Sequence, residues 1–122
     1  MIGYLTLGSN DLEKAAHYYD SLLNGIGATR AYKTEELAVW SFGEGTALFS
    51  ITKPFDGNPA TVGNGVMIAL EAESPEAVDV LHAEALRLGG TNEGDPGQRG
   101  KSFYIGYFRD LDGNKLNFFC RT

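Results

Sequence analysis

The chain has 122 residues, of which 43% are hydrophobic and 21% charged, and its formal net charge is −6. This length can bury the core of one domain, and the negative charge excludes the basic surface that nucleic acids and anionic membranes require. No membrane span or secretory leader is evident and the single Cys120 cannot form an intrachain disulfide, so we expect a cytoplasmic protein without nucleic-acid or membrane partners.

The first half begins with an apolar strand at residues 2–8. A helix follows, for which Asn10 is the expected N-cap, with Glu13 at the spacing of a capping box. Its buried stripe has i, i+3, i+4, i+7 spacing and consists of Leu12, Ala15, Ala16, Tyr19, Leu22 and Leu23. Three strands are then predicted, at residues 28–33, 37–43 and 46–52.

The linker between the halves is predicted at residues 54–64, where Pro, Gly and Asn are frequent. A strand at residues 65–72 opens the second half. Ser74 caps the following helix, and Pro75 stands at its first position, where proline is favoured. The glycine pair at 89–90 ends that helix.

The closing segment is predicted to contain two strands, at residues 102–109 and 115–120. Residues 91–100 have a loop-like composition, with at most a short strand at their start. Asp110 and Asp112 fall between the closing strands, where their side chains favour a turn-forming role over acid–base chemistry or calcium binding.

The two halves repeat one another at a constant offset. Asp11 corresponds to Ser74 and Gly27 to Gly90, each 63 residues apart. Each half is βαβββ, and three successive strands with short connections must be largely antiparallel. The expected fold is therefore α+β, with two modules related by internal duplication (1–53 and 65–122) around a shared cleft.

Several runs of the sequence resemble one known family. They are the opening Tyr4–Lys14 with Tyr18 and Tyr19, and the closing Arg109–Leu116 (RDLDGNKL), which is close to the family signature R-D-P-D-G-N-K-I. The chain resembles the vicinal oxygen chelate superfamily of glyoxalase I, bleomycin-resistance proteins and extradiol dioxygenases, in particular its short lactoylglutathione lyase-like members. The resemblance implies one domain over residues 1–122, whose βαβββ strands curl into a cleft, and a homodimer.

The resemblance also locates a possible metal site. In the enzymes of the superfamily, His and Glu side chains at four strand positions hold a divalent ion such as zinc, nickel or manganese. The corresponding positions here are Tyr4, Phe49, Met67 and Asn117. None is a His or a carboxylate, the donors that such ions require. The histidines, His17 and His82, fall on helices. We therefore expect no metal cofactor.

Strand alternation predicts which side chains face the cleft. The candidate ligand-binding residues are Tyr4, Thr6, Phe49, Met67, Arg99, Tyr104, Tyr107 and Asn117. Arg99 either clamps a carboxylate or phosphate or is a solvated loop charge. Apolar walls with a few polar groups are typical of a small-molecule pocket. The leading hypothesis is a metal-free small-molecule-binding protein; the alternatives are a metal-dependent glyoxalase-like lyase, isomerase or dioxygenase, and an interaction module.

Overall fold

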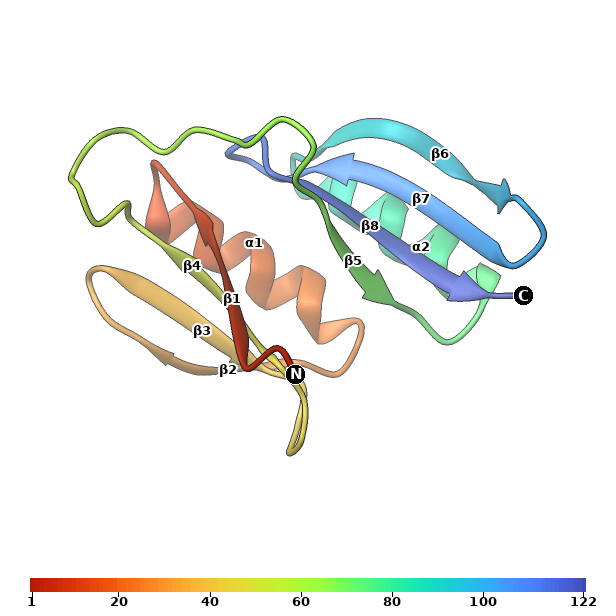
Figure 1. The fold of residues 1–122 in the computed structure, drawn as a ribbon, viewed down its shortest axis with the longest axis horizontal. Helices are drawn as coiled ribbons and strands as arrows, with labels where there is room; N and C mark the ends of the chain where they lie inside the picture. Colours follow the sequence, from red (N-terminus) through yellow and green to blue (C-terminus); the bar gives the residue numbers. More distant parts are fainter. The chain divides into compact units, whose positions relative to one another are not determined.

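The computed structural model describes all 122 residues, which form two compact units, Met1–Val62 and Gly63–Thr122. Each unit contains a four-stranded sheet with one helix against one of its faces (Figure 1). The expected α+β architecture of two similar halves is confirmed. Neither helix is long and apolar enough to cross a membrane.

The first unit contains sheet A. Its elements are β1 (Tyr4–Gly8), α1 (Leu12–Asn24), β2 (Thr29–Lys33), β3 (Leu37–Ser41) and β4 (Leu48–Thr52). The strand order is β1-β4-β3-β2, with β1 parallel to β4 and the other pairs antiparallel. The parallel pair requires a crossover, and α1, β2 and β3 provide it.

The N-cap of α1 differs from the expectation. Asp11, not Asn10, caps the helix, because its side chain accepts a hydrogen bond from the Lys14 backbone N–H. The Asn10 side chain is used elsewhere: its Oδ1 accepts from the Ala60 N–H at 2.7 Å, and its Nδ2 donates to the Ala60 carbonyl at 3.1 Å. Asp and Asn are both favourable N-cap residues. The hydrogen bonds of Asn10 to Ala60, fifty residues away, occupy its side chain, and Asp11 caps the helix.

The core of the first unit lies between α1 and sheet A. Tyr19, Trp40 and Phe49 are fully buried there, with the Tyr19 ring centroid 4.9 Å from Phe49 and 5.8 Å from Trp40. Burying each such side chain contributes about 1.5–3 kcal/mol. The Trp40 indole N–H donates to Asp20 Oδ1 at 2.9 Å, which satisfies the polar end of a buried ring.

The second unit contains sheet B. Its elements are β5 (Ile68–Glu71), α2 (Pro75–Arg87), β6 (Thr91–Arg99), β7 (Phe103–Arg109) and β8 (Lys115–Arg121). The order β5-β8-β7-β6, with β5 parallel to β8, repeats the topology of sheet A. Ser74 caps α2 as expected, accepting from the Ala77 N–H at 3.1 Å. Leu116, Phe118 and Phe108 are fully buried on the α2 side.

The strand β6 is the main difference from the predicted elements. Residues Thr91–Arg99 form a nine-residue strand paired with β7, where mostly loop was expected. Backbone pairing needs no apolar side chains. A segment rich in Gly and polar residues can therefore form a strand without the apolar pattern by which strands are predicted. Its register shifts between Asn92 and Gly94 and again between Gly94 and Gly97, as at the β-bulges where glycine is tolerated in strands.

Candidate functional site

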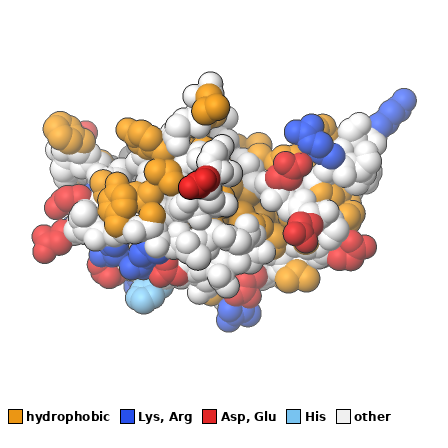
Figure 2. All heavy atoms as spheres, turned by 90° about the horizontal axis from the view of Figure 1, so that it is seen from below, with side chains coloured by type: hydrophobic (Ala, Val, Ile, Leu, Met, Phe, Trp, Pro, Cys, Tyr) orange, Lys and Arg blue, Asp and Glu red, His pale blue; other side chains and the backbone are white.

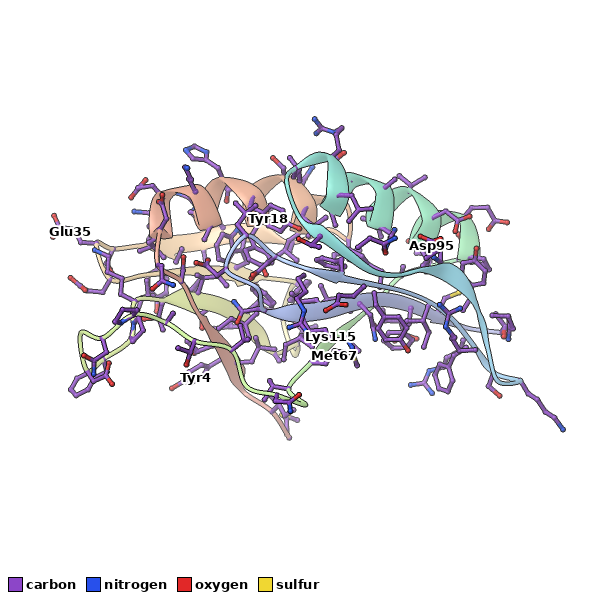
Figure 3. All side chains as sticks on the ribbon, turned by 90° about the horizontal axis from the view of Figure 1, so that it is seen from above. Tyr4, Tyr18, Glu35, Met67, Asp95 and Lys115 are labelled. Carbon is purple, nitrogen blue, oxygen red and sulfur yellow. The ribbon has the colours of Figure 1, made fainter.

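The outer face of sheet A, opposite α1, carries a hollow of about 480 Å³. It is lined by Tyr4, Thr6, Tyr32, Leu37, Val39, Leu48, Ser50 and Thr52, which come from all four strands. Because side chains alternate along strands, the register that pairs Tyr4 with Leu48 and Thr6 with Ser50 places all four on one face. Figure 3 shows Tyr4 on the side of β1 away from α1.

Two hydroxyl groups form the polar floor of this hollow. Thr6 Oγ1 and Ser50 Oγ lie 2.9 Å apart, and Ser50 Oγ lies 2.5 Å from the Leu5 carbonyl oxygen. A serine hydroxyl has one proton, and the carbonyl can only accept. Ser50 therefore donates to Leu5, and Thr6 donates to Ser50. Thr6 Oγ1 keeps its acceptor lone pairs available to a ligand.

Phe49 was expected in the ligand site, and the structure contradicts this. Its side chain is fully buried on the α1 side of β4, packed against Tyr19. The expectation came from aligning the turns before β4 and β8. The strand pairing corrects it by one residue, because Ser50 pairs with Thr6 just as Asn117 pairs with Ala69. Ser50 is thus the outward-facing counterpart of Asn117.

The outer face of sheet B, opposite α2, brings Met67 and Asn117 together. Asn117 Nδ2 donates to Met67 Sδ at 3.5 Å, and Figure 3 shows Met67 on the side of the sheet away from α2. The Asn117 side chain is almost completely buried, and its Oδ1 has no hydrogen-bond partner. An unpaired buried acceptor costs about 1–3 kcal/mol and is uncommon enough to require an explanation.

Tyr107 lies beside Asn117 on the same face, since the two residues are cross-strand partners of β7 and β8. Two cations approach its ring: the Arg99 guanidinium carbon at 5.8 Å from the centroid and Lys115 Nζ at 5.4 Å. Arg99 therefore faces the outer side of sheet B. Its guanidinium donates only to backbone carbonyls, of Asp95 at 2.8 Å and of Gln98 at 3.5 Å.

Tyr104 does not belong to this face, contrary to the sequence-based expectation. Its hydroxyl donates to the Asp79 carboxylate on α2 at 2.7 Å, so the side chain lies on the helix side of β7. The hydrogen bond to Asp79 raises the pKa of Tyr104 above its ordinary value, and partial burial adds to the effect. Tyr104 and Tyr107 are three residues apart on β7, so strand alternation places their side chains on opposite faces of the sheet.

Of the remaining residues considered, Asp110 and His82 have structural roles. Asp110 Oδ1 accepts from the backbone N–H groups of Asp112 and Asn114, both at 2.9 Å, as expected of a turn residue. His82 is buried on α2, with Nε2 2.9 Å from the Tyr107 carbonyl oxygen, and His17 is exposed.

The comparison with protein-family models matches residues 1–118 to the Glyoxalase/Bleomycin resistance protein/Dioxygenase superfamily. The chain belongs to this superfamily. Among functionally curated proteins, no relative of the chain is found.

Several solved structures are similar over nearly the full length of the chain. A glyoxalase/bleomycin resistance protein from Albidiferax ferrireducens T118 is 37% identical, with a TM-score of 0.92 and coverage of 100% of this chain and 99% of that one. The S. aureus protein SA1046, described as hypothetical, is 25% identical, with a TM-score of 0.75 and coverage of 96% and 91%. A family enzyme from Burkholderia phytofirmans PsJN, 13% identical with a TM-score of 0.79 and 98% coverage of both chains, shares the fold.

The metal that the glyoxalase resemblance implies does not fit the residues present. With the corrected register, the four positions are Tyr4, Ser50, Met67 and Asn117, which offer a phenol, a hydroxyl, a thioether and an amide. Divalent first-row ions select imidazole, thiolate or carboxylate. No group of three or more His, Cys, Asp or Glu side chains is placed to hold a metal ion.

Six of the eight residues that line the hollow were not among the candidates from the sequence, namely Tyr32, Leu37, Val39, Leu48, Ser50 and Thr52, and neither was Lys115 on sheet B. Ser50 was lost through the alignment that selected Phe49. Lys115 was missed although alternation along β8 places it on the face of Asn117, a signal that was present in the sequence. Tyr32 could not have been found, because its strand contains a register irregularity between Arg30 and Tyr32 that changes which side chains share a face.

Proposed function

We propose that this chain is a small-molecule-binding member of the glyoxalase superfamily that works without a resident divalent metal. The observation that carries the proposal is the hollow on sheet A, with two tyrosine rings, aliphatic walls and the Thr6–Ser50 hydroxyl pair at its floor. Its volume of about 480 Å³ is in the range of small-molecule sites.

The chemistry of the hollow indicates the kind of ligand. The lining contains no charged side chain, so a neutral, largely apolar molecule is favoured. Because Thr6 Oγ1 is an available acceptor, the ligand should present one N–H or O–H donor. A glyoxalase-like lyase or isomerase needs a base to move a proton, and neither imidazole nor carboxylate lines the hollow.

Indole and indene test this proposal, since the two ring systems differ mainly in the N–H donor. The ¹⁵N-labelled protein is titrated with each, and amide shifts of residues in the hollow are followed. We expect indole to bind there more tightly than indene. Absence of shifts in the hollow with indole, together with no rise in melting temperature across a broad set of metabolites, would contradict the proposal. A ligand at 100 times its Kd adds about 2.7 kcal/mol to stability.

We also propose that the protein is a cytoplasmic homodimer. Strands β1 and β2 of sheet A and strands β5 and β6 of sheet B are the edges of their sheets, and the unpaired backbone groups of a sheet edge can pair with another chain. Light scattering coupled to size-exclusion chromatography tests the dimer: a mass of one chain over a range of protein concentrations would overturn it. The cytoplasmic location is supported by the free thiol of the buried Cys120. Cell fractionation tests it.

A further inference from the structure

The outer face of sheet B contains cationic groups that are not paired with carboxylates. Two of its arginines are paired: Arg109 with Glu93, and Arg121 with Glu71 at 3.4 Å. Lys115 takes part in no ion pair, and Arg99 donates only to neutral carbonyls. Both are half-buried against the Tyr107 ring. Two positive charges thus approach one ring from opposite ends of β7, since Arg99 pairs with Phe103 and Lys115 with Arg109.

An unsatisfied acceptor lies next to these cations. Asn117 pairs across the strands with Tyr107, whose ring Lys115 Nζ approaches. Lys115 and Asn117 are two residues apart on β8, so their side chains leave the same face about 7 Å apart. Only 2% of the surface of Asn117 is exposed, and its Oδ1 accepts no hydrogen bond. The face therefore has a positive charge at its surface and, two residues along β8, an unpaired acceptor buried beneath it.

We propose that this face of the second unit binds a carboxylic acid that carries an O–H or N–H donor within a few bonds of its carboxylate. The carboxylate pairs with Lys115, the donor satisfies Asn117 Oδ1, and an apolar part of the ligand contacts Phe103 and Phe119, whose ring centroids lie 6.0 Å apart. This site involves none of the residues of the hollow on sheet A, so the two proposals stand independently.

Charge-assisted hydrogen bonds are stronger than neutral ones, so the carboxylate should contribute most of the affinity. The buried amide contributes selectivity, because a ligand that lacks the donor leaves Oδ1 unpaired in the complex. The site should therefore discriminate among acids by the presence of the donor, and among alcohols by the presence of the carboxylate.

Mandelate is the test probe, since it combines a carboxylate, an adjacent hydroxyl and a ring. Phenylacetate lacks the hydroxyl, and styrene glycol lacks the carboxylate. With the ¹⁵N-labelled full chain, we expect millimolar mandelate to shift the Asn117 side-chain amide and the Tyr107 and Lys115 backbone signals. Phenylacetate should bind more weakly and styrene glycol least. Equal binding of all three, or no shift of the Asn117 amide with mandelate, would overturn the proposal.

Variants give the second test. Lys115→Met keeps the aliphatic stem but removes the charge, and should raise the mandelate Kd about tenfold or more. Lys115→Arg should largely retain binding. Lys101→Met, an exposed loop lysine of the same unit, is the control with the same change in net charge. If Lys115→Met and Lys101→Met bind mandelate equally, the carboxylate site is refuted.

Asn117→Leu should remove the preference for mandelate over phenylacetate. Unchanged discrimination in a folded variant would refute the role of the amide. If this variant does not fold, the comparison of the two acids with the unaltered protein decides the same question. Shifts confined to Thr6 and Tyr32 would place mandelate in the sheet A hollow and would refute the second site without affecting the first.

Discussion

Thr6 Oγ1 and Ser50 Oγ lie 2.9 Å apart on the paired strands β1 and β4, and the single Ser50 proton is directed to the Leu5 carbonyl oxygen at 2.5 Å. The direction of both hydrogen bonds is thereby set. The outer of the two hydroxyls, that of Thr6, can accept a hydrogen bond from a molecule in the hollow without losing any protein contact.

The first prediction follows from this relationship. Thr6→Val preserves the shape of the side chain but removes the acceptor, so it should weaken indole binding about fivefold, the equivalent of one neutral hydrogen bond. Indene binding should change little. Thr61→Val, at an exposed position outside the hollow, is the matched control. Titrations followed by NMR measure both. Equal indole affinities for Thr6→Val and Thr61→Val would refute the role of Thr6.

A second prediction concerns Phe49, which the structure places in the core. Phe49→Ala should reduce the free energy of unfolding by about 3–5 kcal/mol, because it leaves a cavity beside Tyr19. Phe55→Ala, at a fully exposed phenylalanine, should change it by less than about 0.5 kcal/mol. Urea unfolding measures both. Similar small effects at the two positions would show that Phe49 is not a core residue.

A third prediction concerns pH. The hydrogen bond and charge of Arg109 lower the pKa of Glu93. A carboxyl whose folded pKa lies below its unfolded value stabilises the fold above the unfolded value, about 4.3 for Glu. That stabilisation is lost as the pH falls through the lowered folded pKa.

Glu93→Gln should therefore destabilise the protein at pH 7, and the difference from the unaltered protein should shrink as the pH falls below about 4.3. Glu73→Gln, at an exposed glutamate outside the ion pairs, controls for the change in net charge. Added salt should also reduce the effect, because both side chains are partly exposed. A difference that grows on acidification would contradict the assignment.

A fourth prediction concerns metal content. Since the donors at the four family positions are a phenol, a hydroxyl, a thioether and an amide, zinc, nickel and manganese should bind far below one ion per chain. Elemental analysis of the purified protein measures this, and chelator treatment should leave the melting temperature unchanged. Near-stoichiometric metal that stabilises the fold would overturn the metal-free proposal.

The sequence by itself determined the family, the two-fold repetition of βαβββ and most element positions. These depend on local signals: the Ser74 cap, the apolar stripe of α1, and the closing run RDLDGNKL, whose turn is held by Asp110. Such signals act between residues close in the chain, so they can be recognised without coordinates.

The tertiary structure decided which side chains share a face. A shift of one residue in a strand moves a side chain to the opposite face, which is why Phe49 belongs to the core and Ser50 to the hollow. The pairing between strands also revealed β6, separated Tyr104 from Tyr107, and brought Lys115 beside Tyr107. The hydrophobic pattern of a strand indicates which of its faces is buried, but the residue that stands opposite each position depends on pairing with strands distant in sequence.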